Sequence, residues 1–236
     1  MREKPAAPPT MGGSVVVLRR LAPALLALVL VQIQAPCPSA GKGWSCYDPL
    51  PGHPTAEERA AFVREVSVYA REAEDLYGVP ARGLVALSSY ESGFGWTRTA
   101  LFANNIFGYK HHPGEPPRVY VLPGQPTSDP NDRYQAFESR RACVLFVAER
   151  LARRPRYHGA AALYRLDLAA GLLPEEAADA WISRIAAAGY NPEGESYAAR
   201  VRKLFYRHVA PVLTLASAGA PPTGPPSPPR VGAAAE

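Results

Sequence analysis

The stretch ALSSYESGFGWTRTALFANNIFGY, residues 86–109, holds the features around which the rest of the chain is organised. In the helix expected to lead into it, Leu84, Leu87, Ser88 and Glu91 recur at the spacing of one buried helical face. A short run rich in glycine and aromatic residues follows at once. We therefore expect Glu91 in a partly desolvated site with a raised pKa, the state that a general acid requires. Taken alone, Glu91 also fits a solvated glutamate at a helix end.

Five motifs decide between these readings. In chain order they are Glu91-Ser92-Gly93-Phe94-Gly95, Ala103-Asn104-Asn105-Ile106-Phe107-Gly108, Tyr134-Gln135-Ala136-Phe137, Arg156-Tyr157, and Gly189-Tyr190 with Tyr197 downstream. In this order the sequence resembles the bacterial peptidoglycan N-acetylglucosaminidases of the flagellar and autolysin type, glycoside hydrolase family 73. The resemblance covers roughly residues 56–209. It implies a mostly helical α+β domain, lysozyme-like, with a small β-hairpin lobe that closes over a glycan cleft.

The resemblance also implies catalytic roles. Glu91 becomes the general acid, and Tyr190 matches the family's tyrosine after the late helix. Many relatives carry a second glutamate in the β-lobe, where this sequence has Asp129 and then Asp132. The second group is therefore Asp132 or Asp129, Glu115 on the flap, or the N-acetyl group of the substrate itself. We include Asp132 in the candidate catalytic set.

Four further residues are candidates for substrate binding. They are Phe94, Asn105, Phe107 and Tyr134. The amide of Asn105 suits a hydrogen bond to a sugar or acetamido group, whereas its alternative role is to shape a turn. The rings of Phe94 and Tyr134 either line the cleft or belong to the core.

Helix signals place these residues on a predicted framework. A capping box at Thr55 opens a first helix that ends at Gly78, and Pro80 opens the helix that carries Glu91. Alternating residues 118–122 predict a hairpin. The other expected helices are 97–102, 139–152, 159–170, 174–188 and 196–209. We expect a domain over residues 55–212, with residues 41–54 as the mature N-terminal segment.

Both ends of the chain differ in composition from its centre. Residues 1–40 carry a basic start, an apolar run and small residues at Pro38-Ser39-Ala40, which indicates a signal peptide cleaved after Ala40 or, alternatively, an uncleaved anchor. We expect an exported protein, periplasmic or extracellular, without stable membrane insertion after cleavage. Residues 213–236 are rich in Pro and Ala, which predicts a disordered tail.

The net charge of the chain limits the kinds of partner that we expect. Without residues 1–40, 22 Lys and Arg remain against 20 Asp and Glu, so the net charge is +2 instead of +5. This charge gives little support to nucleic-acid binding. We expect a monomer that binds peptidoglycan glycan strands and needs no cofactor or metal.

Cleavage leaves Cys46 and Cys143, an even count that predicts a disulfide in an exported protein, although Cys143 also suits a buried free thiol.

The sequence thus predicts hydrolysis of the β(1→4) bond after N-acetylglucosamine in peptidoglycan. Two alternatives remain open. A lytic transglycosylase shares the helix-end glutamate before Ser-Gly, but its Gly-Leu-Met-Gln type of segment is absent here. A catalytically inactive peptidoglycan-binding module is favoured by the missing β-lobe glutamate.

Overall fold

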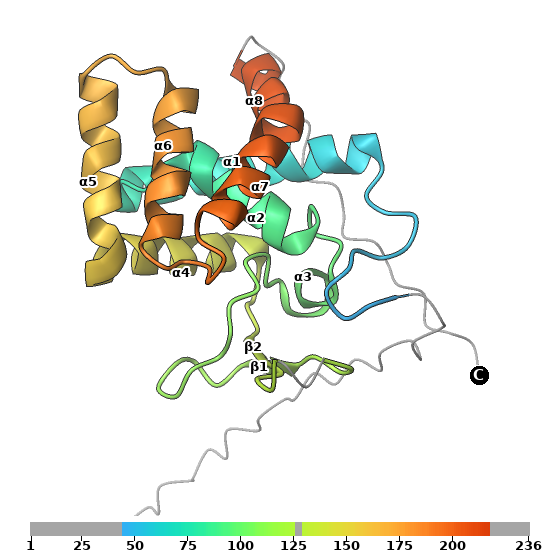
Figure 1. The fold of residues 1–236 in the computed structure, drawn as a ribbon. Helices are drawn as coiled ribbons and strands as arrows, with labels where there is room; N and C mark the ends of the chain where they lie inside the picture. Colours follow the sequence, from blue (N-terminus) through green and yellow to red (C-terminus); the bar gives the residue numbers. More distant parts are fainter. Residues whose placement is uncertain (1–43, 126–128, 218–236) are drawn as a thin grey trace, which may run out of the picture. The chain divides into compact units, whose positions relative to one another are not determined.

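The structure is a computed structural model that describes residues 44–125 and 129–217 of the chain. The predicted signal peptide, residues 126–128 and residues 218–236 lie outside the described residues. The helices are α1 Ala56–Tyr77, α2 Ala81–Ser92, α3 Arg98–Ala103, α4 Arg140–Arg153, α5 Pro155–Ala169, α6 Pro174–Ala187, α7 Glu195–Leu204 and α8 Ala210–Ser217, with a π-helical turn η1 Phe205–Val209 between the last two. Strands β1 Val119–Val121 and β2 Arg133–Gln135 pair as an antiparallel hairpin (Figure 1). The mostly helical α+β class with a small β-lobe is confirmed.

Helix α2 occupies the centre of the helical body. It packs against α1, α6, α7 and η1, and Figure 1 shows it in the middle of the helical body near α1, α6 and α7. Leu84, Leu87 and Ser88 on its predicted buried face are fully buried. Trp181 from α6 is also fully buried, and its ring fits against Gly83, where a side chain would collide with it. The core therefore fixes the helix whose end carries Glu91.

A tight turn redirects the chain directly after Glu91. Gly93, Phe94 and Gly95 all have positive φ angles, of 53°, 55° and 85°. Ser92 stabilises the turn because its hydroxyl accepts a hydrogen bond from the Gly95 amide at 2.8 Å. Position 95 favours glycine because of its positive φ, and also because a Cβ there would lie 2.9 Å from the ring of Phe62. The turn leads the chain from the end of α2 into α3.

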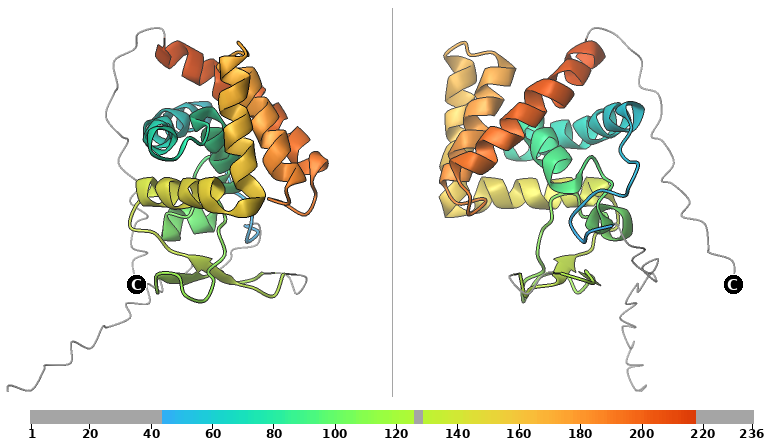
Figure 2. Two further views of the ribbon diagram at one scale, coloured as in Figure 1. Left: turned by 90° about the vertical axis from the view of Figure 1, so that its left-hand side faces the viewer. Right: turned by 45° about the vertical axis from the view of Figure 1, so that its right-hand side comes forward.

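The β-lobe lies on one side of the helical body, where both strands contact α3 (Figure 2). Tyr120 pairs with Tyr134 in the hairpin register. Both rings belong to a small second core with Cys46, Ala103 and Leu122. The N-terminal segment thus packs under the hairpin.

Most element boundaries agree with the sequence-based expectations. The capping box at Thr55 forms, and Gly78 ends α1 in the left-handed conformation. Helix α5 begins four residues earlier than predicted because Pro155 fits its first turn.

The C-terminal boundary needs a correction. The predicted tail began at residue 213, but α7, η1 and α8 run on as one helical stretch to Ser217. Leu213 is buried in the main core, which anchors this last helix.

Within residues 44–125 and 129–217, none of the helices has the length and apolar character needed to span a membrane.

We predict that Gly95→Ala destabilises the fold by about 1–3 kcal/mol, because it adds backbone strain and a contact with the Phe62 ring. The matched control is Gly114→Ala. Gly114 has a similar φ of 87° but open space around it. Thermal unfolding of the two variants separates strain from crowding, and equal losses would contradict the proposed packing role of Gly95.

Candidate active site

Glu91 is the second-last residue of α2, and its side chain lines a cavity of about 1020 Å³. The Tyr197 hydroxyl, from α7, donates a hydrogen bond of 2.5 Å to Oε1. The other oxygen, Oε2, faces Gly108, where an added Cβ would lie 3.8 Å away. Since Gly108 has no side chain, this oxygen is not covered from that side. One carboxyl oxygen is therefore fixed, and the other is left for a ligand.

Burial raises the pKa of Glu91 to about 7, and the hydrogen bond from Tyr197 opposes this shift only in part. Desolvation disfavours the carboxylate because a charge loses more hydration than a neutral acid does. A carboxyl with this pKa is about half protonated at pH 7 and can donate a proton there. The direction agrees with the expectation from sequence.

Tyr197, which bonds to the Glu91 carboxyl, belongs to a group of tyrosine rings in mutual contact. The Tyr197 ring lies 5.9 Å from that of Tyr190 and 5.4 Å from that of Tyr90, and the Tyr190 ring also contacts that of Tyr157. Burial and the nearby charge of Glu91 hold the pKa of Tyr190 well above its ordinary value. Tyr190 lines the cavity as a neutral phenol, so it can donate a hydrogen bond to a ligand.

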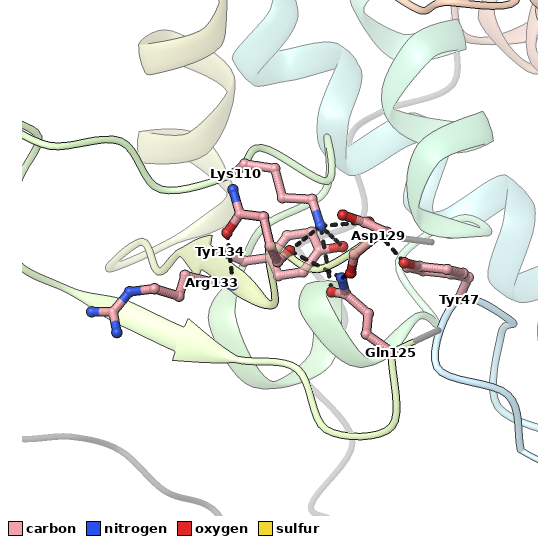
Figure 3. Close-up of polar contacts among 7 residues, drawn as sticks. Tyr47, Lys110, Gln125, Asp129, Arg133 and Tyr134 are labelled. Atoms are coloured by element: carbon pink, nitrogen blue, oxygen red, sulfur yellow. Dashed lines mark hydrogen bonds and ion pairs between the residues drawn. The ribbon is translucent and has the colours of Figure 1, made fainter. Parts of the chain in front are cut away.

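The β-lobe side of the cavity is held together by Lys110 (Figure 3). Its ammonium donates to Asp129 Oδ2 at 2.8 Å, to the Tyr134 hydroxyl at 2.7 Å and to the Asn131 carbonyl at 2.5 Å. Tyr47, from the N-terminal segment, donates to the same Asp129 oxygen at 2.8 Å. These contacts join three separate segments into one wall.

The three candidates for a second carboxylate lie in different places. Asp129 lines the cavity, whereas Asp132 and Glu115 do not. Burial would raise the pKa of Asp129, but hydrogen bonds from Lys110 and Tyr47 outweigh it and hold the pKa below its usual value. Glu115 accepts hydrogen bonds from Tyr109 at 2.7 Å and from Arg150 at 3.1 Å, which keep it away from the cavity surface. Asp132 instead has its backbone carbonyl bonded to Leu122 beside the hairpin.

Of the four predicted substrate-binding residues, Phe107 and Tyr134 line the cavity, but Phe94 and Asn105 do not. Phe94 belongs to the main core, where its ring packs edge-on against Phe62 and His208.

Asn105 is fully buried, and its side chain is occupied by the protein itself. Its amide donates to the carbonyls of Tyr109 and Gln135, each at 2.8 Å. Its Oδ1 accepts from the amides of Tyr109 at 3.0 Å and Phe107 at 3.4 Å. Asn105 therefore shapes the loop behind the cavity, which was the alternative expected from sequence.

The predicted disulfide is not formed, since Cys46 and Cys143 are both free. Cys46 belongs to the small core under the hairpin, and Cys143 belongs to the main core on α4. Burial raises the pKa of Cys143 to about 12, although the amides of Ile106 and Phe107 approach its sulfur. The two residues are structural parts of different clusters.

Sequence reasoning missed Tyr47 and Lys110, which stand in no motif. Arg150 and Arg154, which are not among the candidate site residues predicted from sequence, also line the cavity. The available signal was their spacing of four residues at the end of α4, on either side of buried Leu151. Tyr197 was noted in a motif but was given no role.

Among the residues that the structure describes, no three His, Cys, Asp or Glu side chains form a group able to hold a metal ion.

We predict that Lys110→Met loosens the β-lobe wall, because four acceptors lose one common donor. Amide hydrogen exchange in β2, residues 133–135, should accelerate roughly tenfold, while exchange in α2 stays unchanged. The matched control is Lys203→Met, on the exposed side of α7. Unchanged exchange in β2 would show that Lys110 does not hold the lobe.

Comparisons with known proteins identify the family and the fold to which the chain is similar. The sequence model of the glucosaminidase family, described as mannosyl-glycoprotein endo-beta-N-acetylglucosaminidase, matches residues 67–209. No curated protein matches the chain significantly.

Two solved structures are similar in fold. The glycoside hydrolase domain from Salmonella typhimurium FlgJ is 19% identical with a TM-score of 0.51, over 70% of this chain and 95% of that chain. A peptidoglycan hydrolase mutant from Sphingomonas sp. A1 is 22% identical with a TM-score of 0.52, over 66% of this chain and 99% of that chain. They confirm the lysozyme-like fold class. With more than half of its residues matched by the family model, the chain belongs to the glucosaminidase family, glycoside hydrolase family 73.

Proposed function

We propose that this protein is a peptidoglycan hydrolase that cleaves the β(1→4) bond after N-acetylglucosamine, with Glu91 as the general acid. The observation that carries the proposal is the Glu91 carboxyl on the cavity wall, whose pKa burial raises to about 7. Cleavage of a glycosidic bond requires a proton on the leaving oxygen. Tyr197 fixes the orientation of the acid through its hydrogen bond to Oε1.

The second requirement is a group that stabilises the positive charge developing at the sugar carbon. Asp129 is the best placed of the three carboxylates considered from sequence, because it lines the cavity and its lowered pKa keeps it ionised. The Oδ2 atom of Asp129 accepts hydrogen bonds from both Lys110 and Tyr47. Asp132 is the weaker candidate because its side chain is not part of the cavity wall.

Two other groups compete with Asp129 for this role. Glu193 also lines the cavity, where it pairs with Arg200 at 2.5 Å. The substrate's own acetamide is the remaining choice, and the neutral phenol of Tyr190 is suited to orient it. Asp129→Asn and Glu193→Gln distinguish the three possibilities, since an acetamide mechanism tolerates both substitutions.

The proposed setting of this activity is the periplasm or the cell exterior, reached through the signal peptide predicted at residues 1–40. The proposed substrate is the glycan strand of peptidoglycan, and the protein acts as a monomer without a cofactor. The small net charge of +2 expected after cleavage gives no reason to add a nucleic-acid partner.

The test is release of soluble muropeptides from purified sacculi by the mature protein. We expect products that end in reducing N-acetylglucosamine, and Glu91→Gln should lower the rate by roughly 10²–10⁴-fold because it removes the proton donor. The control is Glu57→Gln, an exposed acid in the first turn of α1, which should act like the wild type.

Other outcomes identify the alternatives. Anhydro products, lighter by one water, would assign the protein as a lytic transglycosylase. Binding to sacculi without product release by either form would assign it as an inactive binding module. Equal rates for the wild type and Glu91→Gln would contradict the role of Glu91.

A further inference from the structure

The charged side chains on the cavity wall are almost all compensated by an opposite charge. The ion pairs are Lys110 with Asp129 at 2.8 Å, Arg150 with Glu115 at 3.1 Å, and Arg200 with Glu193 at 2.5 Å. Of the Asp, Glu, Lys and Arg side chains on the described wall, two belong to none of these pairs. They are Glu91, whose pKa of about 7 leaves it partly neutral, and Arg154. Arg154 is therefore the one permanently charged wall residue that has no carboxylate partner in the described part of the chain.

Arg154 is held in place despite its exposure. It stands at the junction of α4 and α5, where an extended backbone conformation precedes Pro155. Its Nη2 donates to the Tyr109 hydroxyl at 2.8 Å. That hydroxyl already donates to Glu115 and accepts from Arg150. Tyr109 thus positions the Arg154 guanidinium without neutralising its charge.

The position of Tyr109 is itself fixed by the loop behind the cavity. Its ring packs edge-on against Phe146 at 5.1 Å, and its amide donates to the buried Asn105 at 3.0 Å. Arg154 is consequently attached to the same loop, held by the hydrogen bonds of Asn105, that brings Gly108 next to Glu91. A ligand that reaches Glu91 along this wall meets a preoriented cation.

The chemistry of a glycan strand indicates what this cation binds. N-acetylglucosamine is neutral, whereas muramic acid residues carry a lactyl carboxyl group. That carboxylate is free on strands stripped of peptide, and on intact strands the stem peptide supplies other carboxylates. A guanidinium presents paired donors that match a carboxylate.

We propose that Arg154 is a specificity-determining residue that binds a carboxylate carried by the muramyl side of the substrate. This inference rests on the proposed function, because it takes peptidoglycan as the substrate. It adds that the cavity distinguishes strands with acidic groups from neutral N-acetylglucosamine polymers.

Calorimetric binding to Glu91→Gln protein tests the inference without turnover. The probes are a neutral chito-oligosaccharide, a peptide-free N-acetylglucosamine–muramic acid strand of the same length, and that strand with its stem peptides. Adding Arg154→Gln should weaken binding of an acidic strand roughly tenfold and leave the chito-oligosaccharide unchanged. The matched control is Arg153→Gln, since Arg153 pairs with Glu149, is 72% exposed and does not line the cavity.

The pattern of losses identifies the carboxylate. A loss on the peptide-free strand assigns the lactyl group, and a loss only on the peptide-bearing strand assigns a stem carboxylate. Equal losses on all three probes, or none on either acidic strand, would overturn the role of Arg154 while leaving the proposed function intact. If the Glu91→Gln protein binds none of the probes, the proposed function fails together with this inference.

Discussion

The burial of one carboxyl group, that of Glu91, is the constraint on which the site depends. Removing a carboxyl from water raises its pKa, and a single strong donor, the Tyr197 hydroxyl at 2.5 Å, limits the shift. This balance requires α2 to run through the core and α7 to pack beside its end. It also requires the chain to turn sharply after Glu91, which the positive φ angles of residues 93–95 provide.

The β-lobe side of the cavity holds charged side chains, and these charges are paired with one another. Lys110 ties the β-lobe to the N-terminal segment through Asp129 and Tyr47, and this pairing keeps Asp129 ionised. Glu115 compensates Arg150 in the same way. The cavity therefore combines a neutral or half-protonated acid with an ionised carboxylate, the division of labour that glycosidic cleavage requires. Arg154 has no such carboxylate partner in the described part of the chain, and we propose that it binds a charged group of the ligand.

Local sequence signals predicted the framework well where the deciding interactions are local. The capping box at Thr55, the glycine at residue 78 and the spacing up to Glu91 each act within one or two helical turns. The signals failed where distant segments meet. Nothing near Lys110 in the sequence indicates that it contacts Asp129, and the motif around Asn105 could not show that the protein itself uses its amide. The disulfide prediction failed for the same reason, since counting cysteines does not reveal that the two lie in separate cores.

The most direct test of this account is the titration of Glu91 itself, followed by carbon-13 NMR of its carboxyl in the folded protein and assigned with Glu91→Gln. The account predicts a midpoint near pH 7, so that the acid is mostly protonated below this pH and loses its proton above it. A midpoint near the ordinary value of 4.5 would contradict it, because Glu91 would then be an ionised carboxylate at neutral pH and could not serve as the proton donor.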